Sequence, residues 1–158
     1  VVMAHGNRYG GGGMVGGGVG VRMDGMDLQL TGLIGTDNTG EMAVGFTIDL
    51  GAEIFKTKIG LIEYMLNILV GGFYTHREVA RNWGTRLGIE NAGGSVGLSL
   101  ELKDTAKSVN FMKNNLSISY VVKVAFDIGL DGRYCRNRHT YMRSLLYGGY
   151  VRLEFRLW

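Results

Sequence analysis

The sequence predicts an all-β protein, an antiparallel up-and-down transmembrane β-barrel of about eight strands, and three observations lead to this prediction. Residues 116–131 alternate strictly between apolar side chains and small or charged ones, as the two faces of a strand require. The same alternation recurs along most of the 158 residues. The composition includes 27 glycines and no proline, which cannot donate a hydrogen bond within a sheet. Long, paired strands are therefore expected along the chain.

Eight alternating stretches are expected as strands. They are residues 15–23, 26–34, 41–55, 59–74, 83–90, 95–103, 116–131 and 145–158. The stretch 59–74 is ambiguous, because its apolar residues fit one face of a helix as well as a strand. Turns are expected at Asp-Gly 24–25, at the polar run 36–40 and at Asn-Ala-Gly-Gly 91–94. The remaining connections are a loop or short helix at 76–82 and polar segments at 104–114 and 131–143.

The length fits one domain, divided into a glycine-rich lead-in at 1–14 and a barrel at 15–158. Within the glycine-rich region, Gly11, Gly13 and Gly16 have the G-x-G-x-x-G spacing of dinucleotide sites. Such a site needs a helix directly after the motif, but the alternating VGVRMD follows instead. The glycines are therefore interpreted as part of a flexible or closely packed strand.

The composition also argues against several other classes of protein. A single cysteine, Cys135, excludes an internal disulfide framework and a cysteine-based zinc site. The sequence contains no uninterrupted run of about 18 apolar residues, so a membrane-spanning helix is not predicted. The three histidines lie far apart without ligand spacing, so no metal or cofactor is predicted. Residues 105–158 carry 9 Lys and Arg against 3 Asp and Glu, yet several of these basic residues alternate within strands, so nucleic-acid binding is not predicted.

Two closed arrangements compete for the alternating strands. A soluble barrel buries its apolar face, whereas a membrane barrel turns that face to lipid and keeps polar residues in the lumen. Here the face opposite the apolar one is crowded with glycine, alanine, serine and threonine and carries charges of both signs, which suits a narrow lumen where charges pair. The predicted lumen network consists of Arg22, Asp49, Glu53, Arg86, Glu90, Glu101, Lys123, Asp127, Arg152, Glu154 and Arg156.

Several segments resemble small bacterial outer-membrane β-barrels of the eight-stranded OmpA or OmpX type. They are GGGVGVRM, MAVGFTIDLGAEI, SVGLSLEL, LSISYVVKVAFDIGL and the terminal YGGYVRLEFRLW, within residues 15–158. The resemblance implies a location in the bacterial outer membrane, a signal peptide removed on export, insertion by the outer-membrane assembly machinery and both termini in the periplasm. It also implies an assembly signal ending in a lipid-facing aromatic residue. Phe155 has that parity, but the final Trp158 does not.

The connection at 131–143 is strongly basic and is the candidate binding loop. Arginine forks suit phosphate groups. In a barrel of this class, such a loop would contact lipopolysaccharide phosphates or the acidic surface of a protein partner. The candidate binding residues are Arg133, Arg136, Arg138, His139 and Arg143.

The expected role is structural, anchoring or recognition at a surface, either alone or as a subunit of an envelope assembly or a homo-oligomer, and not catalysis. One alternative is a soluble, self-assembling β-protein such as a tube, sheath or capsid subunit, with apolar faces buried between sheets or copies. A second is a lipid-modifying barrel enzyme that acts on lipid A with His139, Ser144 and Asp131, although the local motifs of such enzymes are missing. Outward aromatic residues such as Tyr74, Tyr120 and Phe155 are candidates for interfacial girdles.

Overall fold

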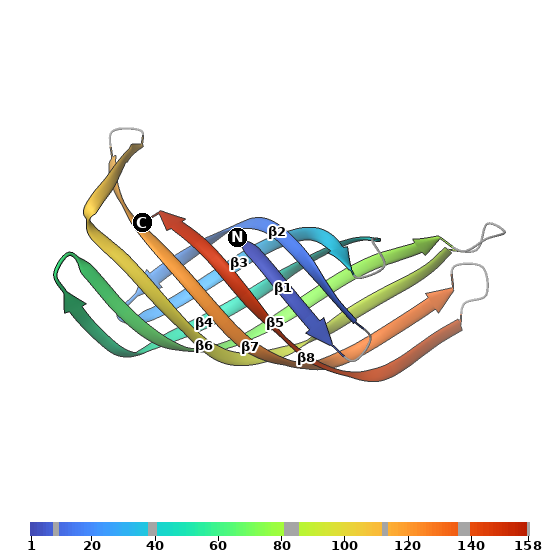
Figure 1. Ribbon diagram of the computed structural model, residues 1–158. Helices are drawn as coiled ribbons and strands as arrows, with labels where there is room; N and C mark the ends of the chain where they lie inside the picture. The colour runs from blue at the N-terminus through green and yellow to red at the C-terminus, as the bar shows by residue number, and fades with distance from the viewer. Residues whose placement is uncertain (8–9, 38–40, 81–85, 112–113, 136–139, 158) are drawn as a thin grey trace.

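The strands of this chain form one closed antiparallel sheet (Figure 1). The computed structural model describes residues 1–7, 10–37, 41–80, 86–111, 114–135 and 140–157. The strands are β1 (Val2–Asn7), β2 (Gly10–Met23), β3 (Met26–Asp37), β4 (Met42–Ile59), β5 (Ile62–Ala80), β6 (Arg86–Phe111), β7 (Asn114–Cys135) and β8 (Thr140–Leu157). Each strand pairs with its neighbours in sequence, and β1 pairs with β8, which closes the barrel. The all-β, eight-stranded, up-and-down prediction is confirmed.

Two tight turns lie at the same end of the ring. Asp24 and Gly25 connect β2 to β3 with positive φ angles of 45° and 78°, as the Asp-Gly pair predicts. Gly60 has φ of 62° in the turn between β4 and β5, where a glycine avoids the strain of a Cβ atom. Because the strands alternate in direction, β1 begins and β8 ends toward this end as well. Among the described residues, no helix is long and apolar enough to cross a membrane.

The predicted turn at residues 91–94 is wrong, because these residues lie inside β6. Asn91 pairs with Thr75 on β5, and Gly93 pairs with Gly129 on β7. A Cβ atom on Gly93 would lie 2.3 Å from the Ile128 carbonyl oxygen. The glycine therefore allows close approach of two strands and does not mark a chain reversal. Residues 86–90 and 95–103, predicted to lie in two strands, belong to one strand.

Other connections are also shorter than the sequence predicts. The ambiguous stretch 59–74 is a strand, and β5 continues to Ala80 through most of the expected loop at 76–82. β6 continues to Phe111 past a register shift between Asp104 and Ser108. The expected loop at 131–143 is largely strand, since β7 extends to Cys135 and β8 starts at Thr140. These polar segments have low intrinsic strand propensity, but they are strands because each pairs with a long neighbouring strand. That pairing satisfies their backbone N–H and C=O groups.

The first residues of the chain form a strand, β1, that was not predicted. Residues Val2–Asn7, expected as part of a lead-in, form β1 between β2 and β8. The glycine-rich stretch from Gly10 belongs to β2, so its G-x-G-x-x-G spacing lies within a strand and does not form a dinucleotide loop.

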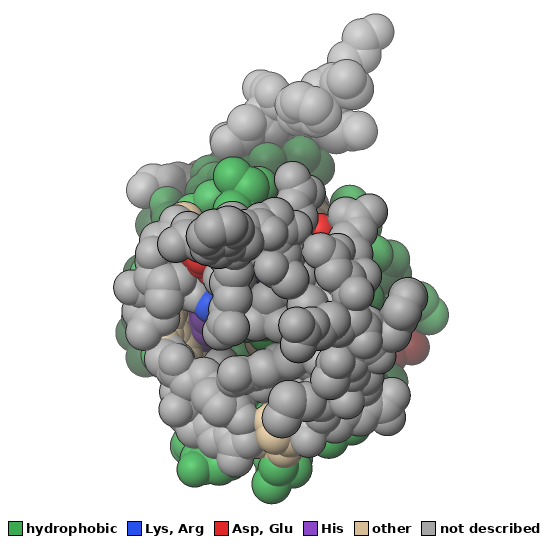
Figure 2. Space-filling view, turned by 90° about the vertical axis from the view of Figure 1, so that its right-hand side faces the viewer, with side chains coloured by type: hydrophobic (Ala, Val, Ile, Leu, Met, Phe, Trp, Pro, Cys, Tyr) green, Lys and Arg blue, Asp and Glu red, His purple; other side chains and the backbone are tan. Residues whose placement is uncertain are grey.

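The apolar faces of the strands point outward. Val124, Phe126 and Leu153 are 48%, 71% and 54% exposed, whereas Lys123 and Arg152 are 1% and 0% exposed. Hydrophobic side chains accordingly surround the ring when it is viewed along the strands (Figure 2). A soluble arrangement with the apolar face inside the ring and the charged face in water is therefore wrong for this chain. Buried polar or charged side chains from six strands, β3 to β8, lie in the interior.

Candidate functional site

The interior of the ring is built from alternate residues of all eight strands. Each of these strands directs one parity inward, so a polar residue at every second position brings its side chain to the axis. Among the side chains that the structure describes, ten hydrophobic ones and thirteen polar or charged ones are buried. Charged side chains therefore fill a substantial part of the middle of the ring. Eight charged residues are joined to one another by ion pairs, and we call them the interior cluster. Its members are Arg22, Asp27, Asp49, Glu101, Lys123, Arg152, Glu154 and Arg156.

One half of the interior cluster consists of Arg152, Lys123, Asp49 and Glu154, each at most 4% exposed. The Arg152 guanidinium forms an ion pair with Asp49 and donates a hydrogen bond to the Thr47 hydroxyl at 2.6 Å. Lys123 Nζ lies 3.1 Å from both Asp49 Oδ2 and Glu154 Oε1. Arg152 Nε is 2.7 Å from the same Glu154 oxygen. Two cations therefore share two carboxylates away from water.

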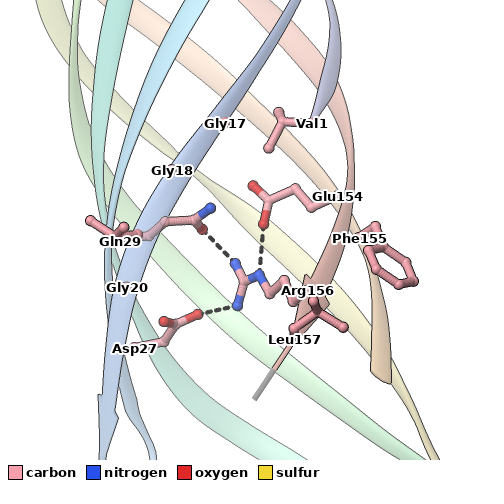
Figure 3. A pocket seen from close by; sticks show the side chains of 11 residues that line it. Val1, Gly17, Gly18, Gly20, Asp27, Gln29, Glu154, Phe155, Arg156 and Leu157 are labelled. Atoms are coloured by element: carbon pink, nitrogen blue, oxygen red, sulfur yellow. Dashed lines mark hydrogen bonds and ion pairs between the residues drawn. The ribbon is translucent and has the colours of Figure 1, made fainter. Parts of the chain in front are cut away.

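Arg156 joins this half to the rim of the ring (Figure 3). Its Nε donates to Glu154 Oε2 at 2.7 Å, and its terminal nitrogens bind Asp27 and the Gln29 amide oxygen. The same Gln29 oxygen accepts a hydrogen bond from Lys123 at 2.7 Å. Glu101 lies 3.6 Å from Arg156. The contacts are therefore continuous from the middle of the ring toward its end.

Arg22 completes the interior cluster from β2. Its two terminal nitrogens donate to the two oxygens of Glu101 at 3.3 and 2.5 Å, a bidentate arrangement that suits arginine and carboxylate. Glu101 is fully buried, whereas the Arg22 side chain is 25% exposed. With Arg22 included, the interior cluster has four cations and four carboxylates, so its formal charges cancel.

Charge balance of this kind determines what the interior can do. A buried charge without a partner is costly, but a network in which each charge has partners can hold strands in one register. The cluster joins residues far apart in sequence, such as Arg152 on β8 and Asp49 on β4. It braces opposite walls of the ring and occupies the middle of the lumen with large side chains.

The structure brings together seven of the eleven predicted lumen residues. These are Arg22, Asp49, Glu101, Lys123, Arg152, Glu154 and Arg156. Asp127 also faces inward, but it lines a separate small cavity of about 50 Å³ with His5, Thr75 and Asn91. Glu53 is exposed at the rim, where its backbone N–H donates to the Gly25 carbonyl. Arg86 lies in β6, and its side chain falls outside the described part of the chain.

Glu90 is on the outer side of the ring, so its prediction as a lumen residue is wrong. Parity along β6 is continuous from the exposed Leu98, which places residue 90 outward and Ile89 inward at 7% exposure. The His76 side chain on the neighbouring strand lies 3.7 Å from the Glu90 carboxylate. The error follows from the predicted turn at 91–94, because a turn there would have reset the parity.

Four residues that were not predicted as lumen residues complete the interior contacts: Asp27, Gln29, Thr47 and Tyr150. Tyr150 donates from its hydroxyl to Asp49 at 3.5 Å, and its ring lies 5.4 Å from the Arg152 guanidinium carbon. All four share the inward parity of their strands, which is the signal that identifies them. Asp27 and Gln29 alternate with the exposed Leu28 and Leu30.

The candidate binding loop lies at the end of the ring opposite the tight turns. Arg133 belongs to β7 and pairs with Met142, while Arg143 belongs to β8 and pairs with Gly132. The side chains of Arg133, Arg136, Arg138, His139 and Arg143 lie outside the described residues, as does that of Asp131 from the lipid A alternative. Over the described residues, no group of three or more histidine, cysteine, aspartate or glutamate side chains could hold a metal ion.

Comparison with known proteins does not assign this ring to a family. Neither a scan against protein-family models nor searches of curated proteins and of solved structures found a match to the chain.

Proposed function

We propose that this chain is a transmembrane β-barrel of the bacterial outer membrane, of the OmpA or OmpX type, with a structural, anchoring or surface-recognition role. The observation that carries the proposal is the inverted distribution of side chains: apolar residues cover the outside of the ring while the interior cluster pairs its charges inside. A water-exposed ring with this surface would aggregate, because monomeric soluble proteins rarely expose large contiguous apolar patches. Lipid is the environment in which the same surface is stable.

The height of the apolar belt supports a bilayer as that environment. On β7 the outward stripe runs from Ile118 to Leu130. These residues extend about 40 Å along the strand, or about 28–33 Å along the axis for a strand tilted by 35–45°. The hydrocarbon core of a bilayer is about 30 Å thick. A closed ring also leaves few unpaired backbone groups facing lipid.

Aromatic pairs on the outer face fit interfacial girdles. Tyr120 and Phe155 meet edge to face with ring centroids 5.7 Å apart, near the end of the ring that carries the tight turns. Phe46 and Tyr74 stack at 5.5 Å, nearer the opposite end. Tyrosine rings prefer the boundary between hydrocarbon and head groups.

The filled interior favours anchoring or recognition over transport. Arg152, Lys123 and Glu101 are among the largest fully buried side chains, and they occupy the space that a conducting pore would need. Recognition would then fall to the loops. The basic segment between β7 and β8 would face the cell exterior, given termini in the periplasm, where lipopolysaccharide phosphates and partner proteins are available.

Single cysteines along β7 test the proposal in a Cys135→Ser background. With the protein folded into lipid vesicles, Val124→Cys and Phe126→Cys should react with a lipid-phase probe and resist a water-phase probe. Ala125→Cys, which points into the ring at 2% exposure, is the matched control and should be protected from the lipid-phase probe. Equal reactivity of all three positions, or sedimentation of the untreated protein as a large particle without detergent, would support the self-assembling alternative instead.

A further inference from the structure

A small cavity lies inside the ring, between the interior cluster and the end opposite the tight turns. Its volume is about 50 Å³. Thr47 and Tyr150 line it on one side, where both form hydrogen bonds with members of the interior cluster. Thr75, near the end of β5, and Asn91, near the start of β6, line it on the other side. Charged and histidine side chains are visible within the ring from that end (Figure 2), which indicates that the interior is open there.

The carboxylate of Asp127 lines this cavity without a cation beside it. Among the described residues, Asp127 forms neither an ion pair nor a hydrogen bond, and His5 lines the same cavity without pairing with it. The interior cluster has no cation to spare, because its four cations and four carboxylates already cancel. A charge in a closed interior is costly unless it is paired. The cavity provides space next to Asp127 for a bound cation.

Three polar groups around the cavity can accept hydrogen bonds. Tyr150 donates its hydroxyl proton to Asp49 at 3.5 Å, so its oxygen has lone pairs for a further donor. The Asn91 amide nitrogen donates to the Thr75 hydroxyl at 3.3 Å, which directs the Asn91 carbonyl oxygen away from Thr75. The Asp127 carboxylate can only accept when it is ionised. A ligand with several N–H donors and one positive charge therefore matches these groups.

The rest of the cavity wall is apolar and limits the size and kind of ligand. It includes Met3, Leu33, Phe73 and Leu146. A calcium or magnesium ion takes six or more oxygen ligands, which such a wall does not supply. A short alkyl chain, by contrast, gains stability from burial against apolar side chains. A water-sized group needs about 10–15 Å³ of cavity volume, so the cavity admits a ligand of about four non-hydrogen atoms.

We propose that this cavity binds a short primary alkylammonium ion. The ammonium group pairs with the Asp127 carboxylate, and the oxygens of Tyr150 and Asn91 accept its remaining N–H groups directly or through water. The alkyl chain lies against the apolar wall. The proposal concerns only the inside of the ring, so it can fail without affecting the proposed function, which rests on the outer face.

Methyl NMR tests this proposal with the full chain folded in detergent micelles and labelled with ¹³C at the methionine methyl groups. The probe is n-propylammonium chloride at pH 7 and constant ionic strength, and 1-propanol is the uncharged ligand of equal size. Met3 lies in the cavity wall, whereas Met23 is exposed on the outer face and serves as the internal control. n-Propylammonium should shift the Met3 signal saturably with a Kd of about 1 mM and leave the Met23 signal unchanged. 1-Propanol should give no saturable shift.

Asp127→Asn removes the charge and keeps the size of the side chain, so it should weaken binding of n-propylammonium about tenfold or more. Asp24→Asn, in the exposed turn between β2 and β3, is the matched control and should bind as tightly as the unchanged protein. The methionine signals also show whether each variant is folded. The proposal is overturned by the absence of a saturable Met3 shift, by an equal shift with 1-propanol or by equal affinity of Asp127→Asn. Half-saturation by K⁺ at a lower concentration than by n-propylammonium would overturn it as well.

Discussion

Replacing Asp49 by asparagine removes one charge from the most buried part of the interior cluster and keeps the size of the side chain. Asp49 is 2% exposed and is shared by Arg152 and Lys123. Both cations are out of contact with water, so they cannot be rehydrated when the carboxylate is lost. Removing one partner of a buried ion pair costs about 3–5 kcal/mol of folding stability.

The contacts that remain place the expected cost at the lower end of this range. Glu154 stays 2.7 Å from Arg152 Nε and 3.1 Å from Lys123 Nζ, so neither cation is left without a carboxylate. We expect Asp49→Asn to lower the free energy of unfolding by about 3 kcal/mol. For a slope of about 2 kcal/mol per molar urea, the unfolding midpoint falls by about 1.5 M. Urea titration of the protein in lipid vesicles, followed by tryptophan fluorescence, measures this shift.

Asp127→Asn is the matched control for this experiment. Asp127 also faces inward, but its Oδ1 has no hydrogen-bond partner among the described residues. Asp127→Asn should shift the urea unfolding midpoint by less than about 0.5 M. Adding Lys123→Met to Asp49→Asn restores the charge balance of the interior cluster and should recover part of the loss. If Asp49→Asn and Asp127→Asn shift the midpoint equally, pairing inside the ring does not stabilise it as argued.

Three further experiments test the outer face, the packing between strands and the rim. Val124→Arg, at the middle of the apolar belt, should lower the free energy of unfolding in vesicles by about 2–4 kcal/mol. Leu130→Arg, near the edge of the belt, should lower it clearly less. Equal losses would contradict a bilayer around the ring. Gly97→Ala should cost about 1–3 kcal/mol, because its Cβ atom would lie 2.1 Å from the Val124 carbonyl oxygen, whereas Gly17→Ala should change stability little. Lys56→Ala should lower the free energy of unfolding by less than about 1 kcal/mol, because the side chain is 48% exposed in its ion pair at the rim.

Strand parity was predictable from the sequence because it depends only on local alternation. The outward face of residues 116–131 and the inward face that carries Lys123 follow directly from the two-residue period. The Asp-Gly turn at 24–25 was equally local, since both residues tolerate positive φ. Seven of the predicted lumen residues lie in the interior cluster for the same reason.

The number of strands was predicted correctly through two errors that cancel. Splitting β6 at residues 91–94 added one strand, and treating Val2–Asn7 as a lead-in removed one. Both errors concern segments whose structure depends on a partner far away in sequence. β1 is a short stretch that becomes a strand because β2 and β8 flank it, and the glycines of β6 are tolerated because neighbouring strands pack closely against them.

The pairs inside the ring could not be predicted, because they depend on the stagger between strands as well as on parity. Arg152 and Asp49 are 103 residues apart, and Arg156 and Asp27 are 129 apart. Sliding β8 by two residues along β7 would keep every side chain on its face but exchange Arg152 for Glu154 at the same level of the ring. The like charges brought together by such a slip would be costly in a closed interior. The interior cluster is therefore consistent with one register among those that the alternation allows, which gives its charges a structural role that the apolar face cannot fill.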